Sequence, residues 1–129
     1  MGITDNLDVY RTVLNHVVRP DNAADRQDSP HVYLTAWEAL FIRNELLDYA
    51  HYHARDNTEE RIALAYEEYI NMLVRDERKG AVCLYAHTRK AWTVMLDALR
   101  NSPDVEVAEW VNDKVSDAFL DAADEGLID

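Results

Sequence analysis

The chain has 129 residues and a formal net charge of −12, with 13 Lys and Arg against 25 Asp and Glu. This length suits a single domain, and a hydrophobic content of 48% excludes disorder of the whole chain. The negative charge disfavours direct binding to nucleic acid, because such binding needs Lys and Arg to neutralise phosphates. It favours a basic protein partner, or a role of the carboxylates in solvation.

The composition also indicates a compartment. Cys83 is the only cysteine, so no disulfide and no cysteine zinc site can form within the chain, which favours a reducing environment. The first eight residues are largely polar, unlike a signal peptide, and no apolar run approaches the ~20 residues of a membrane span. We therefore expect a cytoplasmic protein that does not bind membranes. The scarcity of Lys and the excess of Asp fit either a salt-rich (halophilic) cytoplasm or a high-GC genome.

Sparse turn residues, with 3 Gly and 3 Pro, favour a few long elements. The first predicted helix begins near Asp5 and ends before Pro20, with apolar residues at helical spacing. A polar segment from Pro20 to Pro30 follows. We interpret it as a surface loop, and a binding loop is the alternative.

The second helix has the clearest predicted start, because Thr35 and Glu38 have the spacing of a capping box. This helix runs to about Arg55. Residues 32–34 are briefly extended in this interpretation; alternatively, Ser29 caps the helix more than a turn earlier.

Three further helices are predicted, with these limits: Asn57 (capping with Glu60) to near Gly80, about Val82 to Arg100, and Ser102-Pro103 to Gly126. Leu127 can supply the hydrophobic contact of a Schellman motif after the last of them. Short connections after Asp56 indicate an all-α fold, a single antiparallel bundle of about five helices that forms one domain over residues 1–129.

The second helix is apolar most of the way round. Trp37, Phe41 and Tyr52 lie away from its face of small residues, so this helix is either central or buries these aromatics against another chain. Arg43 lies near the middle of the small-residue face. We expect a buried ion pair there, or a side chain whose stem packs while its head reaches solvent.

The last helix carries the strongest charge pattern. Acidic residues recur at every fourth position: Glu109, Asp113, Asp117, Asp121 and Glu125. The carboxylates are ~6 Å apart along the axis, and each step drifts by ~40° around it. The pattern predicts a docking surface for a basic protein, and its regular spacing is similar to a phosphate backbone. The alternative is the solvated outer face of an acidic protein.

Patterns for catalysis and metal binding are weak. Asp48 and His51 have the spacing of a helical metal motif, but the sequence offers no second such motif. His87 follows Cys83 by four residues, which on a helix would let the imidazole lower the thiol pKa. No third group to orient the histidine is evident, so we expect no metal, no cofactor and no catalytic residue.

The sequence thus predicts a small non-enzymatic interaction or regulatory protein that docks a basic partner through its last helix. A sharper version is an inhibitor that mimics nucleic acid and acts on a host nuclease or DNA-binding protein. The alternatives are a helical metal-binding protein or enzyme using Asp48, His51 and His87, and a homodimer through the second helix.

Overall fold

The computed structural model describes residues 30–76, 80–86 and 88–128, so the predicted first helix and nearly all of the Pro20–Pro30 loop lie outside the described residues. The elements, in chain order, are β1 (His31–Thr35), α3 (Ala36–Tyr52), α4 (Asn57–Asp76), β2 (Ala81–Tyr85), α5 (Arg89–Arg100) and α6 (Val105–Asp124). The prediction of a mostly helical fold is confirmed. The described part holds four helices of the about five predicted for the chain, and it adds a two-stranded sheet that was not predicted.

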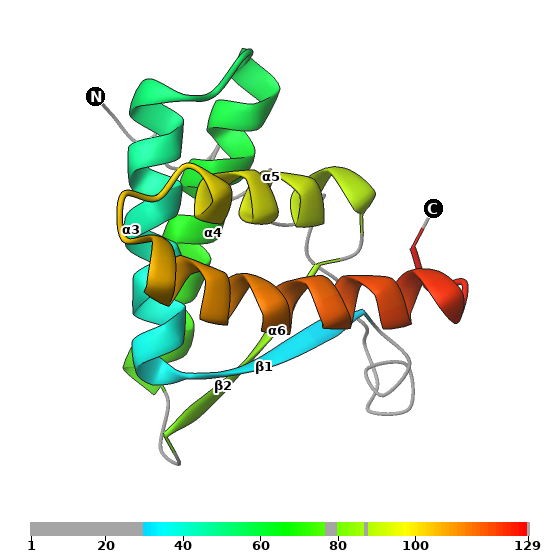
Figure 1. The fold of residues 1–129 in the computed structure, drawn as a ribbon. Helices are drawn as coiled ribbons and strands as arrows, with labels where there is room; N and C mark the ends of the chain where they lie inside the picture. Colours follow the sequence, from blue (N-terminus) through cyan, green and yellow to red (C-terminus); the bar gives the residue numbers. More distant parts are fainter. Residues whose placement is uncertain (1–29, 77–79, 87, 129) are drawn as a thin grey trace.

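The helices form two antiparallel hairpins that cross (Figure 1). The first hairpin is α3 with α4, and the second, α5 with α6, runs across α3. Helix α3 contacts α4, α5 and both strands, so it is central, as expected. The prediction of a single antiparallel bundle did not specify this crossing, because short connections fix only which helices are neighbours. The crossing angle between hairpins depends on how their side chains pack.

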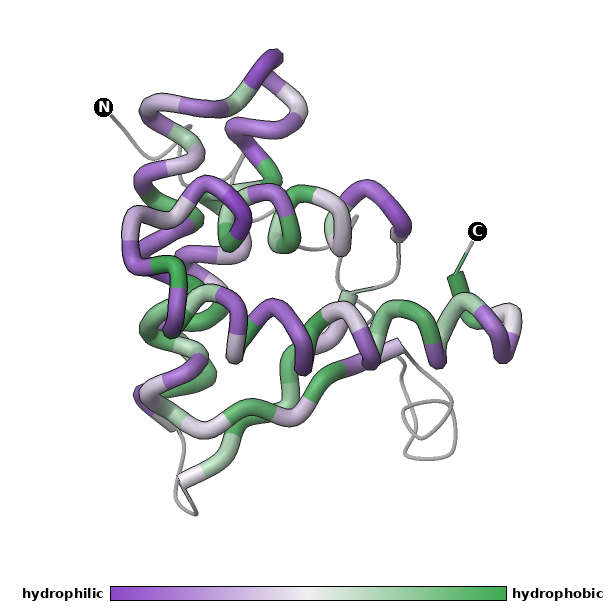
Figure 2. Tube along the Cα trace, viewed as in Figure 1, coloured by the Kyte–Doolittle hydropathy of each residue, from purple (hydrophilic) through white to green (hydrophobic). Residues whose placement is uncertain are grey.

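The strands pair in antiparallel register, with Val32 opposite Leu84 and Leu34 opposite Val82. These four residues are buried, whereas their neighbours along each strand are more exposed, which is the period of two expected for a strand. Hydrophobic residues run along both strands in Figure 2. The predicted extended segment at 32–34 is therefore confirmed.

The prediction that the fourth helix begins at about Val82 is wrong. Residues 81–85 form β2, and α5 begins only at Arg89, where the Thr88 side chain accepts a hydrogen bond from the Ala91 N–H. A short apolar run can form either a helix or a strand. Here the partner strand β1, far away in the sequence, supplies the hydrogen bonds that decide the outcome.

The start of α3 is the predicted capping box. The Thr35 hydroxyl accepts from the Glu38 N–H at 3.3 Å, and the Thr35 N–H donates to the Glu38 carboxylate at 2.8 Å. Because residues 31–35 are extended, the alternative start one turn earlier is wrong.

The start of α4 differs from the prediction by one residue. The Glu59 N–H donates to the Asp56 carboxylate at 2.9 Å, so Asp56 rather than Asn57 caps this helix. Glu59 does not reach back to the cap residue but accepts from the Arg55 N–H at 2.8 Å.

At the end of α6 the expected Schellman motif is present. Gly126 has φ +74°, its N–H donates to the Ala123 carbonyl at 3.1 Å, and the Leu127 N–H donates to the Ala122 carbonyl at 2.9 Å. Leu127 packs against the core, which supplies the hydrophobic contact.

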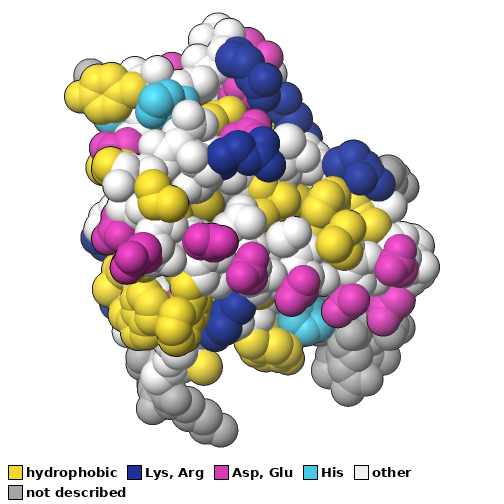
Figure 3. Space-filling view, in the orientation of Figure 1, with side chains coloured by type: hydrophobic (Ala, Val, Ile, Leu, Met, Phe, Trp, Pro, Cys, Tyr) yellow, Lys and Arg dark blue, Asp and Glu magenta, His cyan; other side chains and the backbone are white. Residues whose placement is uncertain are grey.

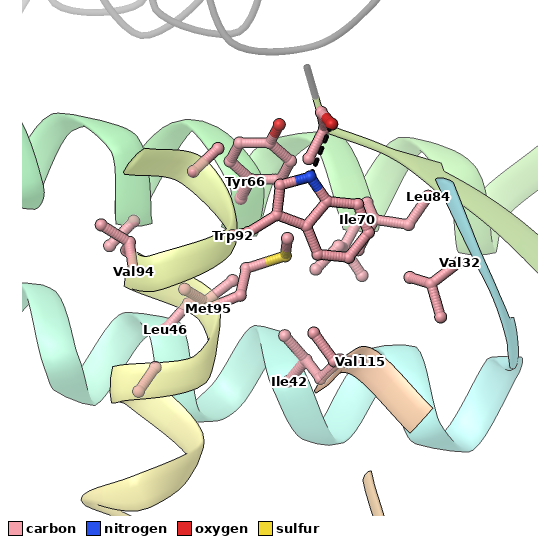
Figure 4. Packing of buried hydrophobic residues seen from close by; sticks show 14 of the residues in the cluster. Val32, Ile42, Leu46, Tyr66, Ile70, Leu84, Trp92, Val94, Met95 and Val115 are labelled. Carbon is pink, nitrogen blue, oxygen red and sulfur yellow. Dashed lines mark hydrogen bonds between the residues drawn. The ribbon is translucent and has the colours of Figure 1, made fainter. Parts of the chain in front are cut away.

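The core lies where the two hairpins and the sheet meet (Figure 4). Trp92 of α5 is fully buried there, and its indole N–H donates to the Ala86 carbonyl at 2.7 Å. Side chains from every described element surround it, including Ile42, Ile70 and Val115.

A buried carboxylate joins three helices. Glu59 is 2% exposed and accepts hydrogen bonds from the Tyr49 hydroxyl at 3.1 Å and the Lys90 ammonium at 2.9 Å, as well as from Arg55. The Arg55 side chain and backbone hold the pKa of Glu59 far below its usual range, although burial opposes them. Glu59 therefore stays charged and connects α4 to α3 and α5.

Candidate docking surface

The predicted carboxylates of α6 form one continuous surface feature, here called the acidic row: Glu109, Asp113, Asp117, Asp121 and Glu125. All five are exposed, while the opposite side of α6 buries Ala108, Val111, Val115 and Ala122. Figure 3 shows acidic side chains following one another along this helix.

The acidic row winds across the outer face of the protein. Glu109 lies beside a hollow between the ends of α5 and α6 that Leu99 and Arg100 also line. Asp121 and Glu125 line a different hollow, shared with His31 and Tyr33 around β1. The row therefore passes from the α5 side to the β1 side of α6, as a drift of ~40° per step requires.

No residue of the acidic row forms an ion pair within the described part of the chain. The ion pairs between described residues join other partners: Lys114–Glu38, Arg55–Glu59, Lys90–Glu59, Arg55–Asp97 and Arg100–Asp97. Lys114 is the only cation of α6, and it lies next to Asp113 in the sequence. It nevertheless pairs with Glu38 of α3, so it forms no ion pair with the row.

Glu38 is the buried anchor beneath this surface. It is 1% exposed and accepts from the Trp110 indole N–H at 2.9 Å and the Lys114 ammonium at 2.9 Å, in addition to Thr35. Burial raises the pKa of this carboxyl, but the hydrogen bonds from Thr35, Lys114 and Trp110 outweigh it and leave the pKa below its ordinary value. One carboxylate thus caps α3 and fastens α6 to it.

Two exposed tryptophans, here called the tryptophan pair, lie at the N-terminal end of the acidic row. Trp110 is 60% exposed and Trp37 is 50% exposed. Their ring centroids are 6.2 Å apart in an edge-to-face arrangement. Hydrophobic side chains gather at this end of α6 in Figure 3. Trp110 directly follows Glu109 and precedes Asp113 by one turn, so aromatic and acidic groups adjoin.

The other predicted interface residues of α3 are separated from one another. Phe41 is partly buried and packs against the core, whereas Tyr52 is 78% exposed at the far end of the helix. Tyr52 therefore lies away from Trp37, and the three aromatics do not form one patch.

Arg43 forms no buried ion pair among the described residues, and its partly exposed side chain is closer to the alternative in which the stem packs and the head reaches solvent. Arg43 is half-buried, and its guanidinium donates to the amide oxygens of Asn44 and Asn71, both at 2.9 Å. No carboxylate of the described residues pairs with it. Asn71 of α4 is the partner because α3 and α4 pack side by side, which the sequence of one helix cannot reveal.

A hollow of about 350 Å³ lies beside the C-terminal half of α3, lined in part by Glu45, Asp48, Tyr52 and His53. Burial raises the pKa of Glu45, a hydrogen bond from Ser102 opposes that rise, and the nearby charge of Asp48 adds to it.

The structure does not assemble the residues of the metal alternative. Asp48 and His51 are both exposed, and His87 lies outside the described residues. Over residues 30–76, 80–86 and 88–128, no three His, Cys, Asp or Glu side chains are placed to hold a metal ion.

The less favoured possibility that His87 activates the Cys83 thiol rests on both residues lying in one helix. Cys83 lies in β2, so the helical i, i+4 relation to His87 does not exist. Burial raises the pKa of the Cys83 thiol, although hydrogen bonds with Tyr85 and Tyr33 oppose this rise. A raised pKa keeps the sulfur protonated, which is the opposite of an activated nucleophile.

Sequence reasoning found the acidic row but missed the tryptophan pair, because it singled out Trp37 and not Trp110. Its position on the polar side of α6, between Glu109 and Asp113, is the signal that it is exposed. None of the helices described is both long enough and apolar enough to cross a membrane. Comparison of the chain with models of protein families, with curated proteins and with solved structures gives no match.

Proposed function

We propose that this is a non-enzymatic interaction protein that docks a basic protein surface on the acidic row of α6. The observation that carries the proposal is a row of five exposed carboxylates, along α6 and at its C-cap Glu125, that no described cation neutralises. Each pair of like charges at this spacing destabilises an isolated helix by a few tenths of a kcal/mol, so the four successive pairs of the row destabilise it by about 1 kcal/mol together. A bound basic surface would relieve that repulsion, which couples binding to helix stability.

The extent of the acidic row suits a protein partner. From Glu109 to Glu125 it covers roughly 24 Å, at ~1.5 Å per residue. A net charge of −12 would also steer a basic partner toward the protein over long range.

The class of partner that we propose is a nucleic-acid-binding protein. Such a protein carries Lys and Arg arranged to meet phosphates at regular intervals. The steps of ~6 Å along the acidic row offer that partner a comparable series of negative charges. Docking would then block its nucleic-acid site, and the protein would act as an inhibitor.

The test measures binding of a fluorescent oligo-lysine peptide as a function of salt. Reversal of two row charges (Asp117→Lys with Asp121→Lys) should weaken binding by tenfold or more and flatten its salt dependence. The control reverses two exposed carboxylates of α4 (Glu60→Lys with Glu68→Lys), which changes the net charge equally.

The control variant should bind nearly as well as the wild type. If both variants lose affinity equally, the negative charge acts diffusely, and the row is a solvated face rather than a docking surface. For the inhibitor version, wild-type protein should release a basic DNA-binding domain from labelled DNA, and the row variant should not.

A further inference from the structure

We propose that the tryptophan pair is the part of the docking surface that recognises an arginine side chain of the basic partner. This inference rests on the proposed function, and it adds a chemical preference that the acidic row alone does not provide. Carboxylates attract Lys and Arg alike through charge, whereas an aromatic face distinguishes them by shape.

The orientation of the Trp110 ring is fixed by a hydrogen bond to a buried side chain. The one polar atom of its ring, the indole nitrogen, donates to the buried Glu38 carboxylate at 2.9 Å. The same carboxylate holds Lys114, so the ring is fastened at a junction of α3 and α6 and is not free to turn. What Trp110 presents to solvent is therefore the apolar face of the ring, 60% of the residue being exposed.

Trp37 completes the site from a different helix. Its ring meets that of Trp110 edge to face, with the planes inclined at 62°. Two inclined rings form a corner in which a flat group can lie on one ring and touch the edge of the other. No cation among the described residues stacks on either ring, so the corner is open to a partner.

The neighbouring charges select the occupant. Glu109 and Asp113 flank Trp110 on α6, are exposed and have no ion pair in the described part of the chain. A guanidinium can stack flat on an indole ring while its N–H groups, which point outward in the plane, donate to carboxylates at the ring's edge. An ammonium group is compact and strongly hydrated, so it gains less from the same place.

A second copy of this chain is a poor occupant. It carries the same charge of −12, and its own acidic row would meet the first in a symmetric contact. An uncharged apolar partner is also a poor occupant, because burial of the tryptophan pair would desolvate Glu109 and Asp113 without compensation.

The experiment compares fluorescent oligo-arginine and oligo-lysine of equal length, at one salt concentration, against full-length protein. The wild type should bind oligo-arginine two- to fivefold more tightly, which is the size of a cation–π contact at an exposed site. Trp37→Leu should bring the ratio of affinities to about one, because it should weaken the binding of oligo-arginine more than that of oligo-lysine. Among the described residues the Trp37 side chain contacts the ring of Trp110, and a thermal unfolding measurement would check that the variant folds.

Two variants serve as controls. Tyr52→Leu removes an exposed aromatic of the same helix far from the acidic row and should keep the arginine preference. Asp117→Lys with Asp121→Lys should weaken the binding of both peptides by the same factor, so the ratio of their affinities should not change. In the wild type, oligo-arginine should quench tryptophan emission more than oligo-lysine does, because only Trp37 and Trp110 are exposed whereas Trp92 is buried.

The outcomes separate the two proposals. Equal affinity of the wild type for both peptides, or an arginine preference that survives Trp37→Leu, overturns the arginine site and leaves the docking function standing. If neither peptide binds, the docking function itself is overturned. Self-association that Trp37→Leu abolishes in sedimentation would assign the tryptophan pair to a second copy and overturn this inference.

Discussion

Replacement of Glu38 by alanine tests whether this buried carboxylate fastens α6 to the fold. The change removes the acceptor of the capping box, which contributes about 1 kcal/mol, and the acceptor of the Lys114 and Trp110 donors. Hydrogen bonds to a charged group contribute about 1.5–3 kcal/mol each. Both freed donors can return to water because Lys114 and Trp110 are partly exposed, so we expect a net loss of about 3 kcal/mol.

The assay is urea unfolding followed by circular dichroism. Glu109→Ala is the matched control, because that carboxylate is exposed and its loss should change the free energy of unfolding by less than about 0.5 kcal/mol. A loss for Glu38→Ala as small as that of the control would refute the reasoning, since it would mean that the buried contacts contribute nothing beyond solvation.

The pH dependence gives the same prediction a second check. The folded pKa of Glu38 is lowered, so the unfolded chain binds its proton more readily and the stabilisation is complete above the ordinary glutamate pKa. It is lost as the pH falls through the folded pKa. The difference in stability between wild type and Glu38→Ala should therefore be constant near neutral pH and shrink below about pH 4.

Five further variants test three other parts of the fold by the same unfolding assay. Glu45→Gln should stabilise the protein at pH values above the ordinary glutamate pKa and lose this advantage in acid. The reason is that the pKa of Glu45 is raised in the folded protein, so the wild type loses stability as the pH rises. If the variant is no more stable than the wild type at pH 7, the burial of this charge is contradicted. Leu46→Ala should cost about 2–5 kcal/mol and Leu47→Ala under about 1, because Leu46 is 0% exposed and Leu47 is 38% exposed; equal losses would be inconsistent with the packing of α3. Asp56→Ala should cost about 1 kcal/mol and Asn57→Ala a few tenths, and the reverse order would restore the cap predicted from sequence.

Local sequence signals determined the ends and faces of several helices. The capping box at Thr35 and the Schellman motif at Gly126 follow from residues within one or two turns of each other, and the exposed acidic row follows from the periodicity of a single helix. Such features depend on backbone groups that the same short segment supplies, so one segment of sequence is enough to predict them.

Features that join distant segments were decided only in three dimensions. Residues 81–85 became a strand because β1 lies beside them, and Arg43 bonds Asn71 because α4 packs on α3. The sequence assigned Glu38 a capping role, but its pairing with Lys114 and with Trp110 needed the crossing of the two hairpins. Periodicity specifies which face of an element is buried, whereas the partner of that face depends on the packing of the whole chain.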